Sequence, residues 1–135
     1  MKTPQEIVTL MLSKDAFSIW MGIEVLTIKE GSCELRSEIK AEMLNGFGIL
    51  HGGISYSLAD SALAFAANSY GYKSVSIETS ISHVRPAKAG DILSAKAVEL
   101  HRGSTLGIYE ITITNQENKK IALFKGTVFI TAEAW

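Results

Sequence analysis

The sequence predicts an α+β fold in which a curved antiparallel sheet wraps around one long central helix. Residues 54–67 are good helix formers, five of them alanine, with apolar or small side chains around nearly the whole circumference. About six other segments alternate apolar and polar residues as strands do, and four of them are consecutive in the second half of the chain. A helix with so little polar surface needs a sheet to cover it.

Length and composition limit the class of protein. A chain of 135 residues supports one hydrophobic core, so we expect a single domain over residues 1–135. The 13 Lys and Arg against 14 Asp and Glu give a net charge of -1, which argues against nucleic-acid binding. No apolar run approaches the roughly 18 residues of a membrane span, and the N-terminus lacks a signal-peptide layout. We therefore expect a cytoplasmic protein that binds neither nucleic acid nor membrane.

The N-terminus carries the signals of a short helix. Thr3 is a suitable N-cap, Pro4 fits the first helical position, and Glu6 completes a capping box. This helix is predicted to end near Lys14, and a second apolar patch follows at residues 17–21.

A hairpin is predicted next, with strands on either side of a turn at residues 29–31. Cys33, Leu35 and Ile39 alternate with polar residues, which places them on the inner face of the second strand. Cys33 is the only cysteine, so it forms no intramolecular disulfide. We interpret it as a small core residue rather than a nucleophile.

The remaining segments complete the sheet. Residues 45–53 contain four glycines and are predicted to be a loop that leads into the central helix. Further strands are predicted at residues 75–83, 92–100, 106–114 and 121–131. This arrangement is similar to the hotdog fold. A sheet curled around one helix leaves edges and a helix face uncovered, so we expect at least a homodimer.

Asp60 is the one charged residue in the predicted central helix. An ionised carboxylate there is costly unless it is paired or faces a cavity. Either a neighbouring backbone group or a hydroxyl such as that of Ser57 or Ser61 holds it, or it is placed for chemistry. The Gly52-Gly53 pair ahead of the helix favours chemistry, because free N–H groups at a helix N-terminus can stabilise an oxyanion.

Gly52 and Asp60 cannot reach one carbonyl group from the same helix, because eight residues span about 12 Å of helix axis. If two copies pack with their helices antiparallel about a twofold axis, Asp60 of one copy faces the Gly52 amide of the other. The sequence therefore predicts an active site at a dimer interface, present twice per dimer.

The order of motifs resembles the signature of the PaaI-like acyl-CoA thioesterases, which are hotdog-fold hydrolases of phenylacetic-acid degradation. That signature is Asn45-Gly46, four residues, His51-Gly52-Gly53, six residues and Asp60. Counterparts extend over nearly the whole chain and include residues 43–46, 57–60, 85–91 and 121–126.

The resemblance implies a role for each motif residue. Asp60 matches the catalytic carboxylate, which attacks the thioester carbonyl or activates water, and the Gly52 N–H matches the group that polarises that carbonyl. Asn45 matches a residue that positions the water or the thioester. His51 matches a residue that braces the loop. Ser76 matches a strand hydroxyl close to the carboxylate, although its strand face, with Ser74, Glu78, Ser80 and Ser82, is also typical of a solvated surface.

The resemblance also implies the substrate and the assembly. Acyl-CoA, with hydroxylated phenylacetyl-CoA suggested, is the expected partner, and related proteins are homodimers that form homotetramers. Coenzyme A carries phosphates, so basic groups are expected at the tunnel mouth. The candidates are Arg85, Lys88, His101, Arg102 and Gly103.

No cofactor beyond the CoA thioester and no metal is expected, because no His, Asp or Glu spacing suggests a metal site. His83 belongs to the apolar face of its strand and is predicted to pack in the core. Two other functions stay open from the residues alone: a hotdog hydratase or dehydratase acting on hydroxyacyl thioesters, and a non-catalytic acyl-CoA-binding module. The Asn45-to-Asp60 pattern favours the hydrolase over both.

Overall fold

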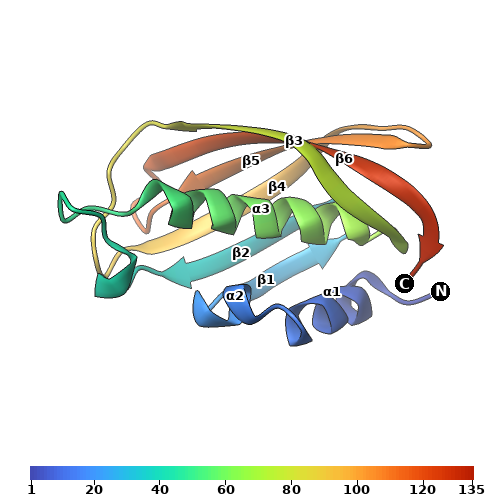
Figure 1. Cartoon of the computed structure of the whole chain (residues 1–135), viewed down its shortest axis with the longest axis horizontal. Helices are drawn as coiled ribbons and strands as arrows, with labels where there is room; N and C mark the ends of the chain where they lie inside the picture. Colours follow the sequence, from blue (N-terminus) through green and yellow to red (C-terminus); the bar gives the residue numbers. More distant parts are fainter.

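The computed structural model describes residues 1–135 and shows one curved antiparallel sheet wrapped around the helix α3 (Figure 1). The strand order is β1-β2-β4-β5-β6-β3. This arrangement confirms the predicted α+β class. The elements are α1 (Pro4–Ser13), α2 (Ala16–Trp20), β1 (Glu24–Lys29), β2 (Ser32–Glu38), the 3-10 turn η1 (Ala41–Met43), α3 (Gly52–Asn68), β3 (Tyr72–His83), β4 (Ile92–Arg102), β5 (Leu106–Thr114) and β6 (Lys120–Ala134).

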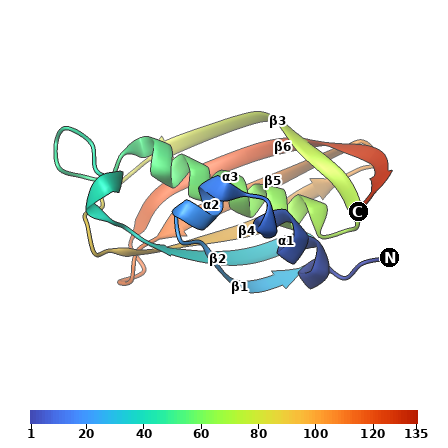
Figure 2. The ribbon, with the colours of Figure 1, turned by 60° about the horizontal axis from the view of Figure 1, so that its bottom comes forward.

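The two N-terminal helices lie beside α3, on the side of it that the sheet leaves open (Figure 2). The capping box predicted for α1 is present, because the Thr3 hydroxyl accepts from the Glu6 amide and the Glu6 carboxylate accepts from the Thr3 amide. The apolar patch after α1 forms a second helix, α2, capped by Asp15. No helix is both long and apolar enough to span a membrane.

The core lies between α3 and the concave face of the sheet. Ten of the 17 residues of α3 are buried, as its nearly uniform apolar surface predicts. Leu58 and Phe65 of the helix belong to one apolar cluster with Tyr109 and Phe124 of the sheet. Each such side chain contributes about 1.5–3 kcal/mol when it is fully removed from water. Cys33 is buried in the same cluster, which confirms the core interpretation.

A β-bulge in β3 changes which of its residues face the helix. The register against β6 shifts between Ser76 and Glu78, so Ser76 lies opposite buried Val128 on the helix-facing side. The prediction that Ser76 and Glu78 share one face of the strand is therefore wrong. His83 also lies on the inner side, opposite buried Ala122, but it is exposed, because β3 ends there beside the first turn of α3. The prediction that His83 packs in the core is wrong.

Candidate active site

The first turn of α3 leaves one backbone donor free. The helix begins at Gly52, two residues earlier than predicted, because His51 acts as the N-cap. His51 Nδ1 accepts from the Gly53 amide at 2.9 Å, and the His51 carbonyl accepts from the Ile54 amide at 2.9 Å. The Gly52 N–H has no partner in the chain and lies at the positive end of the helix dipole. This is the geometry that an oxyanion site needs.

The two hydrogen bonds that His51 accepts hold the turn before α3 in place, which is consistent with the bracing role that the resemblance implied for His51. Replacing His51 with alanine is expected to cost about 1 kcal/mol of stability, since the Gly53 amide loses its cap. His51→Asn keeps a capping side chain and should recover most of that loss. Urea denaturation measures both changes. If His51 acts only as a cap, kcat of the asparagine variant stays near the wild-type value; a loss of kcat with normal stability would show a direct part in catalysis.

Asn45 closes the loop ahead of the helix and lines the same pocket as Gly52. Its side-chain oxygen accepts from the Phe47 amide at 2.9 Å and, more weakly, from the Ile49 amide at 3.4 Å. These bonds fix the side chain and leave its Nδ2 group free to donate to water or a substrate. The pocket has a volume of about 420 Å³.

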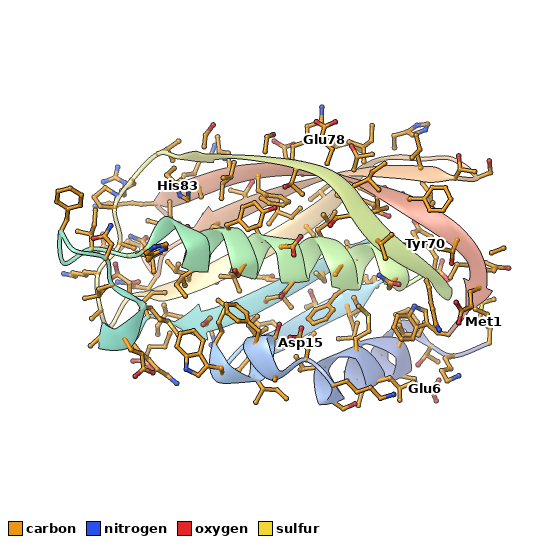
Figure 3. All side chains as sticks on the ribbon, viewed as in Figure 1. Met1, Glu6, Asp15, Tyr70, Glu78 and His83 are labelled. Atoms are coloured by element: carbon orange, nitrogen blue, oxygen red, sulfur yellow. The ribbon has the colours of Figure 1, made fainter.

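Two residues of this pocket were missed at the sequence level, His83 and Ser55. Figure 3 shows His83 beside the first turn of α3. Its Nδ1 atom lies 3.3 Å from the Ser55 hydroxyl, and a Cβ atom at Gly52 would lie 3.1 Å from its Nε2 atom. Gly52 therefore leaves room for the imidazole ring. The alternating pattern of β3 placed His83 on the inward side but gave no signal of this contact, because alternation does not show where the strand ends relative to α3.

Asp60 lies on the stripe of α3 that neither the sheet nor the N-terminal helices fully cover. Neither of the neighbouring serines holds the Asp60 carboxylate, because both bond elsewhere. The Ser57 hydroxyl donates to the Gly53 carbonyl at 2.7 Å, and the Ser61 hydroxyl is bonded to Ser18 at 3.0 Å. The partly covered residues of this stripe are Tyr56, Ser57, Asp60, Ser61 and Ala64.

The surroundings of Asp60 make its carboxylate more basic. Burial raises the pKa of the Asp60 carboxyl above its ordinary value, and the negative charge of nearby Asp15 raises it further. Desolvation and a like charge both disfavour ionisation. A carboxylate with a raised pKa is a stronger base toward water. Ser76 lies on the helix-facing side of the neighbouring strand β3 but shares no hydrogen bond with Asp60 within the chain.

The predicted basic residues fall into two groups. Arg85 lines the Gly52 pocket and also a second hollow of about 500 Å³ that contains Lys88 and Lys119. Lys119, in the turn before β6, is a further basic residue that the sequence analysis did not single out. The same hollow contains Asp91 and Glu117, and Lys119 forms an ion pair with Glu117 at 3.0 Å, so the positive charge not held in an ion pair comes from Arg85 and Lys88. A groove with these two basic side chains suits the phosphates of a CoA-like molecule.

The other basic turn lies at the opposite end of α3. The Arg102 guanidinium stacks on the ring of Tyr70, 3.9 Å from its centroid, just beyond the C-terminus of the helix. Figure 3 shows Tyr70 and His83 at the two ends of α3. Within one chain, His101, Arg102 and Gly103 therefore do not meet Arg85 and Lys88. No group of three or more His, Cys, Asp or Glu side chains is arranged to hold a metal ion.

Comparison with known proteins gives consistent matches. The Thioesterase superfamily model matches residues 47–122. The acyl-coenzyme A thioesterase PaaI of Escherichia coli strain K12 is 41% identical over 116 residues, which cover 86% of this chain and 83% of that protein. The solved structure of E. coli PaaI, from the phenylacetic acid degradation operon, matches with a TM-score of 0.95 and 37% identity, and covers 97% of this chain and 95% of that chain.

A more distant structure was solved with a ligand. The smu.793 protein of Streptococcus mutans, bound to acetyl CoA, has a TM-score of 0.81 and 26% identity, and covers 84% of this chain and 91% of that chain. The fold, the free helix amide and these matches define a hotdog-fold enzyme that hydrolyses thioesters. The chain belongs to the thioesterase superfamily and is a PaaI-like acyl-CoA thioesterase. The resemblance seen in the sequence is confirmed.

Proposed function

We propose that two copies of this chain build each active site of the thioesterase, and that the substrate is an acyl-CoA. The free Gly52 N–H of one copy polarises the thioester carbonyl, and Asp60 of the partner subunit supplies the carboxylate. The observation that carries this proposal is the position of Asp60. It lies on the partly covered stripe of α3 and, at about 12 Å along the axis, is out of reach of its own Gly52 amide.

The reaction needs an ionised carboxylate and a stabilised oxyanion. Asp60 of the partner subunit either attacks the carbonyl carbon or takes a proton from the attacking water. The carbonyl oxygen becomes negative in the tetrahedral intermediate and accepts from the Gly52 amide, which is already oriented by the His51 cap. The Asn45 amide positions the water or the thioester. Ser76 of the carboxylate's subunit is the proposed hydroxyl beside it.

The CoA moiety is proposed to follow the groove from Gly52 past Arg85 to Lys88. The turn at His101, Arg102 and Gly103 is a candidate contact only from another subunit, since it lies at the far end of α3. Acetyl CoA bound to the similar smu.793 protein of Streptococcus mutans supports a CoA thioester as the ligand here. A hydroxylated phenylacetyl group is the proposed acyl group, because the similar E. coli PaaI comes from the phenylacetic acid degradation operon.

We further propose a homotetramer of two such dimers, without any cofactor and in the cytoplasm. An exposed apolar row crosses the outer face of the sheet, where Val75 of β3 pairs with Phe129 of β6 and Phe129 pairs with Leu106 of β5. Contact between two such faces would remove these side chains from water.

Co-expression of two inactive variants tests the shared site. One variant, Asp60→Asn, lacks the carboxylate, and the other, Gly52→Pro, lacks the amide hydrogen. A dimer with one chain of each kind contains one intact site and one site with both defects. Random pairing should therefore restore about a quarter of wild-type kcat, measured by thiol release from an acyl-CoA panel. Two Asp60→Asn chains with different tags are the control and restore nothing. If the site lies within one chain, the mixture also stays inactive.

A further inference from the structure

We propose that His83 is a further catalytic residue, which donates a proton to the CoA sulfur as the thioester C–S bond breaks. This inference rests on the proposed function, because it takes the Gly52 amide as the point where the carbonyl oxygen binds. It adds a group that acts on the leaving CoA thiolate, whereas Asp60, Gly52 and Asn45 act on the carbonyl and the water.

His83 lies within reach of any carbonyl held by Gly52. Its ring occupies the space next to the Gly52 α-carbon, where an added Cβ atom would lie 3.1 Å from Nε2 and 3.2 Å from Cε1. His83, Gly52 and Asn45 line the same pocket. In a thioester the sulfur is bonded to the same carbon as the carbonyl oxygen. A group that lies beside the bound carbonyl oxygen therefore also lies beside the sulfur, provided that the thioester binds with its sulfur turned toward that group.

A hydrogen bond determines which nitrogen of His83 faces the substrate. The Ser55 hydroxyl donates its one hydrogen to the Gly52 carbonyl at 3.1 Å. With this hydrogen donated, the hydroxyl oxygen can accept from the Nδ1–H group of His83, whose nitrogen lies 3.3 Å away. The Nδ1–H group thus donates to the Ser55 hydroxyl, and the Nε2 atom is free to interact with a molecule in the pocket. In the imidazolium form, Nε2–H is a donor directed away from Ser55.

The groove places the sulfur on the side of His83. The pocket of Gly52 and His83 shares Ile49, Arg85, Pro86 and Ala87 with the hollow that holds Lys88 and Lys119. If the phosphates of a CoA molecule lie near these basic side chains, its thiol end extends past Arg85 toward the pocket of Gly52. Gly52 and His83 both line the pocket at the end of this path, so we take the sulfur to arrive beside His83. The acyl group extends in the other direction, toward the partner subunit.

The step balances without a further reactant. Collapse of the tetrahedral intermediate re-forms the carbonyl double bond and breaks the C–S bond, and the sulfur keeps the bonding electron pair. The Nε2–H proton of the His83 imidazolium passes to that sulfur, which gives neutral CoA thiol and a neutral imidazole. The imidazole takes back a proton from water, while the acid product and the Asp60 carboxyl that received a proton from the attacking water each release one to water.

His83→Phe tests this role, because it keeps an aromatic ring against Gly52 and removes both nitrogen atoms. With acyl-CoA, kcat is expected to fall at least about tenfold with little change in KM. With the S-phenyl thioester of the same acid, whose thiolate leaves without protonation, the loss should be less than about threefold. Ser82→Ala, on the outward side of the same strand, is the matched control and should change neither rate.

The outcomes separate this inference from the proposed function. An unchanged kcat with acyl-CoA, a rise in KM alone, or equal losses with both thioesters would overturn the role of His83. Circular dichroism shows whether the phenylalanine variant folds, and His83→Gln, which keeps a polar side chain without an acidic proton, should repeat the selective loss. If Asp60→Asn keeps full turnover, the proposed function fails instead, whatever His83→Phe does.

Discussion

Asp60→Asn is expected to lower kcat for acyl-CoA by about a thousandfold, within the 10² to 10⁴ range of a lost general base. The amide is nearly the same size as the carboxylate, but it can neither take a proton from water nor attack a carbonyl. Since the change leaves the substrate contacts of Gly52 and Asn45 in place, KM should stay within a few-fold of wild type. Release of CoA thiol, followed with dithiobisnitrobenzoate, measures both constants.

The same substitution makes a prediction about stability. The pKa of Asp60 is raised in the folded chain, so the folded state binds this proton more tightly than the unfolded state does. Stability is therefore lost as pH rises from the ordinary pKa of an aspartate through the raised one. Asparagine does not titrate, so above this window Asp60→Asn should be at least as stable as wild type in urea denaturation.

Asp15→Asn is the matched control for Asp60→Asn. It removes a neighbouring negative charge of the same size, and asparagine remains a good N-cap for α2. Its kcat should stay within about threefold of wild type. A similar large loss in both variants would mean that charge near α2, and not the Asp60 carboxylate itself, is needed. Near wild-type turnover by Asp60→Asn would refute the catalytic role directly.

Gly52→Pro is expected to lower kcat by about 10² to 10³, the effect of losing one oxyanion donor. Proline is well tolerated at the first position of a helix, where its missing N–H replaces a group without an intrahelical partner. The preceding His51 has φ -64° and ψ 130°, the extended conformation that a residue before proline favours. The substitution therefore removes the amide hydrogen and leaves α3 intact.

Gly52→Ala separates the lost hydrogen from crowding. Alanine keeps the N–H but places a Cβ atom 3.1 Å from His83 Nε2, as proline also does. The alanine variant should lose no more than about tenfold in kcat, less than the proline variant. Steady-state kinetics with the same acyl-CoA compare the two, and circular dichroism checks that both retain their helix content. Equal losses would assign the effect to contact with His83 rather than to the oxyanion donor.

Local sequence signals predicted the elements well where the responsible interactions are short in range. The capping box at Thr3 and Glu6 forms as expected, since both partners lie within one helical turn. The strand over residues 106–114 matches β5, where strict alternation places Tyr109, Ile111 and Ile113 in the core. The start of α3 was placed two residues late, because a histidine N-cap is an uncommon signal.

The candidate site was only partly predictable. Asn45 and Gly52 were identified by their motif, and the pocket does contain both. His83 was assigned to the core, because its place in the apolar alternation gives no sign that β3 ends there, beside the first turn of α3. The groove from Arg85 to Lys88 and Lys119 joins two turns that are far apart in the sequence, and only the pairing of β4, β5 and β6 brings them together.

By itself, the sequence determined the α+β class, the single apolar helix and the motif from Asn45 to Asp60, and it predicts that a second copy is needed. These follow from side-chain periodicity and from the fixed rise of a helix, which are local properties. The tertiary structure alone decided that the Gly52 N–H is free, that Ser57 and Ser61 do not hold Asp60, and that His83 stands beside Gly52. Those facts depend on strand register and on long-range contacts, which no local pattern encodes.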